Sequence, residues 1–247
     1  MSTCPENRPV EPALIAPEPA GALPLLEAHV RAFVALCERG LDNRSAIAGW
    51  HGTSLESMEL LLRRGSLAAS PVQHVKAAPG HLFFYAAKPE DFETTVQREL
   101  RPDGRSGACL YAESNAQFHF LMREVGLDVA DSAARLRGFE AVRRISERRR
   151  TSGATQEALG LGIQPDRVES VLSELFERKG FLVALSNAAV ERHPVSHGDI
   201  PGDDQKIFVP QGLSFDCIAG IEPLGVKEYE FFEALQRSIE HSDLHTK

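Results

Sequence analysis

A short polar run at residues 50–54, WHGTS in one-letter code, carries side chains well suited to hold a ligand. The imidazole of His51 and the hydroxyls of Thr53 and Ser54 can form hydrogen bonds. Gly52 has no Cβ, so a ligand can approach its backbone closely. An apolar-periodic segment follows and stops at a glycine, which predicts a turn that opens a helix. Ser54 is also a candidate N-cap of that helix, which would be a structural role.

A short aromatic segment at residues 80–86, GHLFFYA, predicts a β-strand. Side chains alternate across a strand, so Phe83 and Tyr85 share one face and Phe84 lies on the other. An aromatic face can stack on a flat ligand ring. The alternative is a buried strand whose rings serve only the core.

These two segments resemble the nucleotide-binding core of the ADP-ribosyltransferase superfamily, in the branch that includes the poly(ADP-ribose) polymerases. In that family a WHG(S/T) turn grips NAD, and a G-x-Y-F strand stacks on its nicotinamide. The resemblance implies that His51 bonds the adenosine ribose and that Gly52 holds the carboxamide through its backbone. Thr53 or Ser54 would add a hydroxyl near the carboxamide.

The match in the aromatic strand needs an adjustment of one residue. On that register Phe83 takes the tyrosine position and Phe84 the phenylalanine position. Phe83 can stack on the nicotinamide but has no hydroxyl. Tyr85, on the same face as Phe83, is an alternative stacking ring.

The family's last motif is a strand opened by a catalytic glutamate, and it corresponds here to residues 202–210, GDDQKIFVP. Cleavage of the nicotinamide–ribose bond develops positive charge on the ribose, which a carboxylate would stabilise. The catalytic position falls on Gln205, whose amide oxygen accepts a hydrogen bond but carries no charge. Asp204 would supply a carboxylate if the register slipped by one residue, although such a slip reverses the face. Three alternatives follow: a weak transferase, a protein that has become a binder, or an enzyme in which another residue substitutes.

The resemblance therefore implies an NAD-dependent mono-ADP-ribosyltransferase, with NAD as a substrate and a macromolecule, first of all a protein, as the acceptor. A second hypothesis is a non-catalytic module of the same fold that binds NAD or ADP-ribose. A third is an unrelated α+β interaction domain. The sequence does not identify the acceptor.

Predicted strands lie towards both ends of the chain with a helical stretch between them, which indicates an α+β fold. The resemblance implies a split antiparallel sheet of the ADP-ribosyltransferase type, with helices and a helical insert at about residues 115–178. Residues 1–24 contain six prolines and predict an extended, mobile tail before a single domain at 25–247. Helices are predicted at 24–39, 54–64, 89–100, 117–125, 133–150, 165–179 and 228–240, and strands at 46–51, 82–87, 108–113, 181–186, 206–210 and 217–224.

The net charge of −8 and the pI of about 5.6 argue against strong nonspecific binding of nucleic acid. An arginine-rich stretch at residues 143–150 leaves a local basic patch open, with a solvated helix face as the simpler interpretation. The four cysteines form no CxxC motif, which indicates reduced thiols in a cytoplasmic protein.

No apolar run approaches the roughly 20 residues that cross a bilayer, so no membrane partner is expected. No secretory signal is recognised, although export through another signal remains open. His193 and His197 have a spacing that suits zinc on a helix, but Pro194 and Gly198 disfavour a helix there. We therefore expect loop histidines and no metal site.

Overall fold

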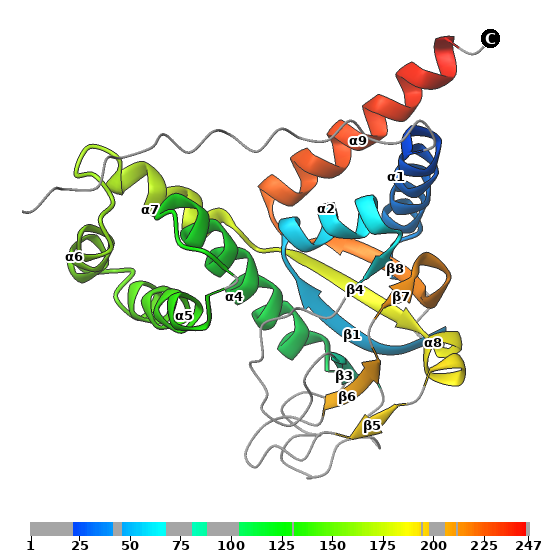
Figure 1. Cartoon of the computed structure of the whole chain (residues 1–247), viewed down its shortest axis with the longest axis horizontal. Helices are drawn as coiled ribbons and strands as arrows, with labels where there is room; N and C mark the ends of the chain where they lie inside the picture. Colours follow the sequence, from blue (N-terminus) through cyan, green and yellow to red (C-terminus); the bar gives the residue numbers. More distant parts are fainter. Residues whose placement is uncertain are drawn as a thin grey trace, which may run out of the picture.

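The computed structural model describes residues 22–41, 46–67, 81–87, 104–129, 131–193, 195–197, 206–210 and 212–245. In these residues the protein has an α+β fold, as the sequence predicts. An antiparallel sheet lies between helices that cover its two faces (Figure 1). The predicted helix at 89–100 and most of the predicted tail lie outside the described residues.

The main sheet has six strands in the order β5-β6-β3-β1-β4-β8, and each neighbouring pair is antiparallel. A separate ribbon of two strands joins β2 to β7. Five of the six predicted strands are confirmed, with ends that shift by at most two residues. The strands are β1 (Ile47–Thr53), β2 (Ser66–Leu67), β3 (His81–Ala86), β4 (Phe181–Ser186), β5 (Ser196–His197), β6 (Lys206–Pro210), β7 (Leu213–Ser214) and β8 (Ile218–Pro223).

Strand β4 is apolar at successive positions because both faces of the sheet are covered. Phe181 and Val183 belong to the core under α1 (Ala22–Arg39), α2 (Leu55–Arg64) and α9 (Val226–His245). Leu182 and Ala184 belong to the opposite core, under α4 (Arg105–Glu124). The predicted helices at 24–39, 54–64 and 228–240 are therefore confirmed as α1, α2 and α9.

A group of helices stands to one side of the sheet, at the left of Figure 1. It consists of α5 (Ser132–Glu147), α6 (Gly153–Gly160) and α7 (Val168–Glu177), which pack with the second half of α4 around a core of their own. Phe118 of α4 and Phe139 of α5 stack there with ring centroids 3.8 Å apart. The predicted helical insert at 115–178 is thus present as helices, although its first helix starts already at Arg105.

The predicted strand at 108–113 is wrong, because these residues form part of α4. Ala108, Ala112 and Ala116 recur every four residues and are buried on one face of the helix. Small side chains give a weak periodic signal, while the Cys109–Tyr111 part of the segment suggests a strand. The sequence also does not predict α6, α8 (Asn187–Arg192) or the short 3₁₀ turn η3 (Phe215–Cys217).

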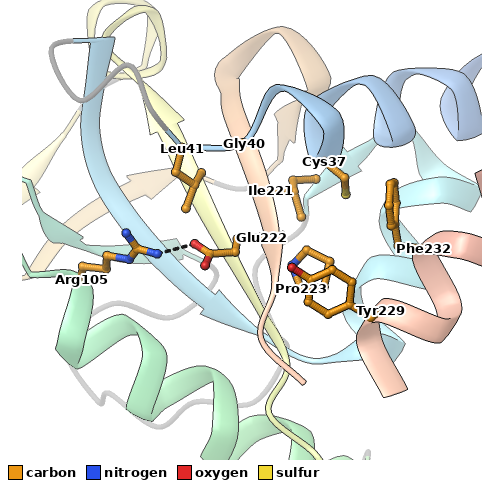
Figure 2. A pocket seen from close by; sticks show the side chains of 9 residues that line it. All are labelled: Cys37, Gly40, Leu41, Arg105, Ile221, Glu222, Pro223, Tyr229 and Phe232. Atoms are coloured by element: carbon orange, nitrogen blue, oxygen red, sulfur yellow. Dashed lines mark hydrogen bonds and ion pairs between the residues drawn. The ribbon is translucent and has the colours of Figure 1, made fainter. Parts of the chain in front are cut away.

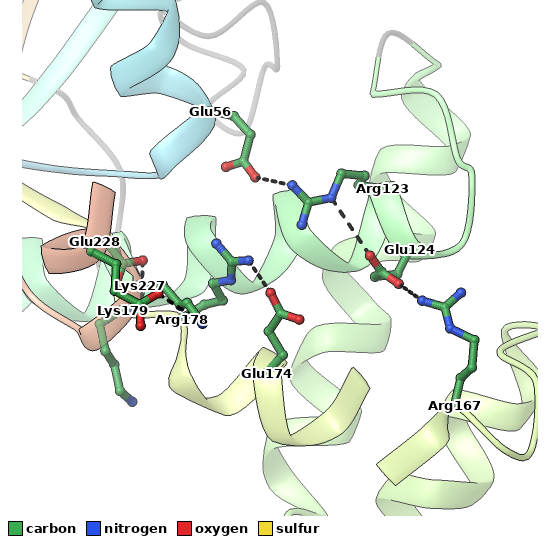
Figure 3. Close-up of polar contacts among 11 residues, drawn as sticks. Glu56, Arg123, Glu124, Arg167, Glu174, Arg178, Lys179, Lys227 and Glu228 are labelled. Atoms are coloured by element: carbon green, nitrogen blue, oxygen red, sulfur yellow. Dashed lines mark hydrogen bonds and ion pairs between the residues drawn. The ribbon is translucent and has the colours of Figure 1, made fainter. Parts of the chain in front are cut away.

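A buried carboxylate holds the start of β4 (Figure 3). Glu228 of α9 is fully buried, and its Oε1 accepts hydrogen bonds from the backbone N–H groups of Gly180 (2.9 Å) and Lys179 (3.3 Å). Its Oε2 is buried without a hydrogen-bond partner among the described residues. Desolvation raises the pKa of Glu228 above its ordinary value, and the two N–H donors offset this only in part.

We predict that Glu228→Gln raises the free energy of unfolding at pH 8 and leaves it almost unchanged at pH 4. Because the pKa is raised in the folded protein, stability is lost as the pH rises through that pKa, and glutamine keeps the accepting oxygen without the charge. Urea unfolding at the two pH values measures the effect. Glu240→Gln, an exposed carboxylate on the same helix, is the control. A variant less stable than the wild type at pH 8 would contradict the prediction.

Candidate functional site

The WHGT motif lies at the end of β1, directly before α2. Ser54 is the N-cap of α2: it is fully buried, and its hydroxyl accepts a hydrogen bond from the backbone N–H of Ser57 (3.4 Å). Gly65 ends the helix in the left-handed conformation, with φ +72°. The structure thus gives the Ser54 hydroxyl the capping role that the sequence offered as an alternative.

Helix α4 lies directly against the backbone of the motif. A Cβ placed on Gly52 would be 1.9 Å from the carbonyl oxygen of Ala108 and 2.6 Å from the backbone nitrogen of Ala112. No side chain fits in that space, so the helix and the strand touch through their main chains. Packing therefore requires a glycine at position 52, because the α4 backbone occupies the space that a Cβ would take.

A second glycine completes this contact. Gly180 precedes β4 with φ +76°, and a Cβ there would be 2.3 Å from the carbonyl oxygen of Thr53 and 2.7 Å from that of Ala112. Three backbones therefore meet at the end of the motif: β1 at Thr53, the start of β4, and the middle of α4. Thr53 itself is buried at 4% exposure, inside this junction.

The main sheet divides beside the motif. Strands β1 and β3 pair only at Gly49↔Ala86 and Trp50↔Tyr85, whereas β1 continues to pair with β4 as far as Thr53. Strand β3 continues on its other side along β6, from Tyr85 to His81. The residues His51 to Thr53 and His81 to Phe84 are thus on strands whose mutual pairing has ended.

The aromatic residues of β3 lie on the two faces that the alternation predicts. Phe84 is fully buried in the core under α1 and α2, where its ring covers Gly49. Tyr85 is 6% exposed on the opposite face, in the cluster with Trp50 and Ala108. The backbone of Phe83 lies in β3, opposite Phe208 of β6. Of the residues that the resemblance places at the NAD site, Phe84 therefore serves packing in this structure.

The predicted site residues are only partly brought together. His51 is half-buried and directly follows Trp50, the last residue of β1 that pairs with β3. Asp204 and Gln205 lie outside the described residues, immediately before β6. Lys206, the first residue of β6, pairs with Tyr85 of β3.

Two residues of α4 lie near the motif and were missed by the sequence reasoning. Tyr111 is half-buried against the cluster that contains Trp50 and Tyr85. The guanidinium carbon of Arg105 lies 5.7 Å from the centroid of the Trp50 ring. Tyr111 lies in the segment 108–113 that the sequence predicts as a strand, and Arg105 lies outside the elements that the sequence predicts.

A chain of ion pairs links α2 to the helical group (Figure 3). Arg123 of α4 lies 3.9 Å from both Glu56 and Glu124, and Glu124 pairs with Arg167 at 2.6 Å. Burial lowers the pKa of the nearby His119, and the charge of Glu56 opposes this shift. These contacts are partly exposed, so each contributes little to the stability of the fold.

Comparison with known proteins adds no relative: no family model, no curated protein and no solved structure matches the chain. Within the described ranges, no group of three or more His, Cys, Asp or Glu side chains is placed to hold a metal ion. His193 follows α8 and His197 lies in β5, so the two histidines do not share a helix. None of the helices in these ranges is long and apolar enough to cross a bilayer.

We predict that Gly52→Ala lowers the free energy of unfolding by about 3 kcal/mol, because the new methyl group overlaps the α4 backbone. Chemical denaturation measures the loss. Gly160→Ala is the matched control, since Gly160 is helical and a Cβ there meets no atom within 4 Å. Equal stability of the two variants would show that α4 is not held against Gly52.

Proposed function

We propose that the chain is an NAD-dependent mono-ADP-ribosyltransferase that modifies a macromolecular acceptor, with a protein as the first candidate. The observation that supports this most strongly is the end of β1–β3 pairing at the WHGT motif. The proposal assigns the space between the diverging strands to the nicotinamide end of NAD.

The hydrogen-bond alternation of β1 supports an amide ligand at Gly52. The backbone N–H of Ala87 donates to the carbonyl of Ala48 (3.0 Å), which directs the peptide groups of Ala48 towards β3. In an antiparallel strand every second residue is directed to the same side, so Trp50 and Gly52 follow. Trp50 has Tyr85 opposite it, whereas Gly52 lies two residues beyond the last pair. The carboxamide of nicotinamide has one carbonyl and an N–H donor, and it would pair with Gly52 as a strand residue does.

The register also indicates which aromatic residue would stack. Continuing the β1–β3 pairs past Trp50↔Tyr85 brings Phe83 opposite Gly52. Phe83 is therefore the proposed stacking residue, and the buried Tyr85 and the half-buried Tyr111 would support it from the core. His51, between Trp50 and Gly52, would bond the adenosine ribose.

The two hypotheses differ in whether the protein can stabilise the positive charge that develops on the ribose. Gln205 would accept a hydrogen bond from the ribose but cannot balance a cationic transition state. Its identity is the specific observation that favours the second candidate, a non-catalytic module that binds NAD or ADP-ribose. Incubation with NAD labelled in its adenylate part distinguishes them. Covalent labelling of protein supports the transferase, and saturable reversible binding supports the module. If neither labelling nor binding is observed, both hypotheses are rejected.

We predict that His51→Ala reduces NAD turnover or binding to background while the melting temperature stays close to that of the wild type. The side chain is half-buried at the proposed ribose position, so its loss acts on the ligand more than on the core. His241→Ala, an exposed position on α9, is the control. If His51→Ala unfolds the protein and the wild type binds no NAD, then His51 belongs to the core alone.

We predict that Gln205→Glu raises ADP-ribose transfer or NAD hydrolysis at least tenfold, which corresponds to about 1.4 kcal/mol of the barrier. Glutamate would restore the negative charge beside the ribose, whereas Gln205→Ala would remove the hydrogen-bond acceptor and lower any residual activity. Initial rates of nicotinamide release measure both effects.

Asp204→Asn tests the register of the same strand. If Asp204→Asn abolishes activity while both Gln205 variants behave like the wild type, Asp204 is the working carboxylate. If none of the three variants changes NAD binding or turnover, the segment before β6 does not supply the catalytic residue.

A further inference from the structure

A cavity of about 360 Å³ lies at the outer edge of the main sheet, along β8 (Figure 2). Strand β4 separates β8 from the motif strand β1, so this cavity is distinct from the space between β1 and β3. Four parts of the chain meet around it: the end of α1 with the following turn, the first residue of α4, β8, and the start of α9. Among the lining residues are Cys37, Leu41, Arg105, Glu222, Tyr229 and Phe232.

An ion pair forms the polar wall of the cavity. A terminal nitrogen of Arg105 donates a hydrogen bond to Oε2 of Glu222, and the two side chains are 31% and 34% exposed. The guanidinium carbon also lies 5.7 Å from the centroid of the Trp50 ring, a cation–π contact that restrains the Arg105 side chain. The cavity is therefore lined by N–H donors and a carboxylate acceptor that lie next to each other.

Among the described residues that line the cavity, the charges of Arg105 and Glu222 are opposite in sign. The Cys37 thiol adds none, because burial raises its pKa to about 12 and keeps it protonated at neutral pH. An anion would be attracted by Arg105 and repelled by Glu222, and the reverse holds for a cation. The wall instead suits an uncharged ligand that offers an acceptor and donors side by side.

The opposite wall suits a flat ring. Tyr229 is 51% exposed at the rim of the cavity, and the half-buried Phe232 lies one helical turn further along α9. Both belong to the side of the cavity away from Arg105 in Figure 2. Aromatic faces stack on heterocycles, and the volume lies near the lower end of the roughly 300–1,000 Å³ typical of small-ligand sites.

We propose that this cavity binds the base of a guanine nucleoside. The C6 carbonyl of guanine would accept from the guanidinium of Arg105, and the N1–H and the 2-amino group would donate to the carboxylate of Glu222. The ring would lie against Tyr229 and Phe232. Adenine offers only one donor and one acceptor on the corresponding edge, so it would form fewer bonds. This assignment is independent of the proposed NAD chemistry.

Calorimetric titration of the full chain with guanosine tests the proposal, with inosine and adenosine as matched ligands. Fluorescence of Trp50, the one tryptophan of the sequence, gives a second readout because Arg105 contacts its ring. We expect one saturable site for guanosine, with affinity at least tenfold higher than for inosine, which lacks the 2-amino group, and for adenosine. No saturable guanosine binding, or equal affinity for the three nucleosides, would overturn the proposal.

The variant Glu222→Gln should weaken guanosine binding at least tenfold, because one accepting oxygen is replaced by a donor. Glu147→Gln is the matched control, since Glu147 is an exposed carboxylate on α5 that also pairs with an arginine. Wild-type affinity in Glu222→Gln would reject the assignment. Should that variant fail to fold, the affinities of the wild type for guanosine and inosine decide whether the assignment stands. The NAD measurements on His51 and Gln205 variants remain separate, so failure of one proposal leaves the other intact.

Discussion

The contact of three main chains at Gly52, Gly180 and Ala112 sets the positions of the other elements. Each glycine removes a side chain at a point where a Cβ would lie well inside contact distance of a neighbouring backbone. This lets α4 lie on the sheet more closely than larger side chains allow. The end of β1, the start of β4 and the first half of α4 are therefore fixed relative to one another. Glu228 secures the same junction from the other side through the N–H groups of Lys179 and Gly180.

The motif residues depend on this junction for their geometry. Strand β1 is held by β4 and α4 as far as Thr53, while β3 leaves it after Trp50. The peptide groups of Gly52 are consequently held on a rigid strand rather than on a loop, which is the arrangement that a rigid amide contact requires.

The elements that the sequence predicts well are those whose signal is local. The apolar run of β4 and the cap residues Ser54 and Gly65 of α2 specify their segments without help from distant parts of the chain. Helix α4 is different, because the buried residues of its first half are small, and Ala108 and Ala112 lie against Gly52 and Gly180, which are distant in sequence. The motif could be recognised from the residues of β1, whereas the packing role of Gly52 and the cavity at β8 arise from tertiary contacts. Arg105 and Glu222, 117 positions apart in sequence, carry no local pattern that would pair them.

Helix α4 is shared by two hydrophobic cores. Its first half packs on Trp50 and Leu182 of the sheet, and its second half supplies Phe118 and Leu121 to the core formed with α5, α6 and α7. A helix that belongs to both cores makes their unfolding cooperative, since the loss of either one exposes apolar surface on the same twenty-residue segment. The backbone amides of α4 should therefore exchange with solvent deuterium only in openings that involve both the sheet and the helical group. The helices α5, α6 and α7 therefore stabilise β1, the strand that carries the motif, through their packing on α4.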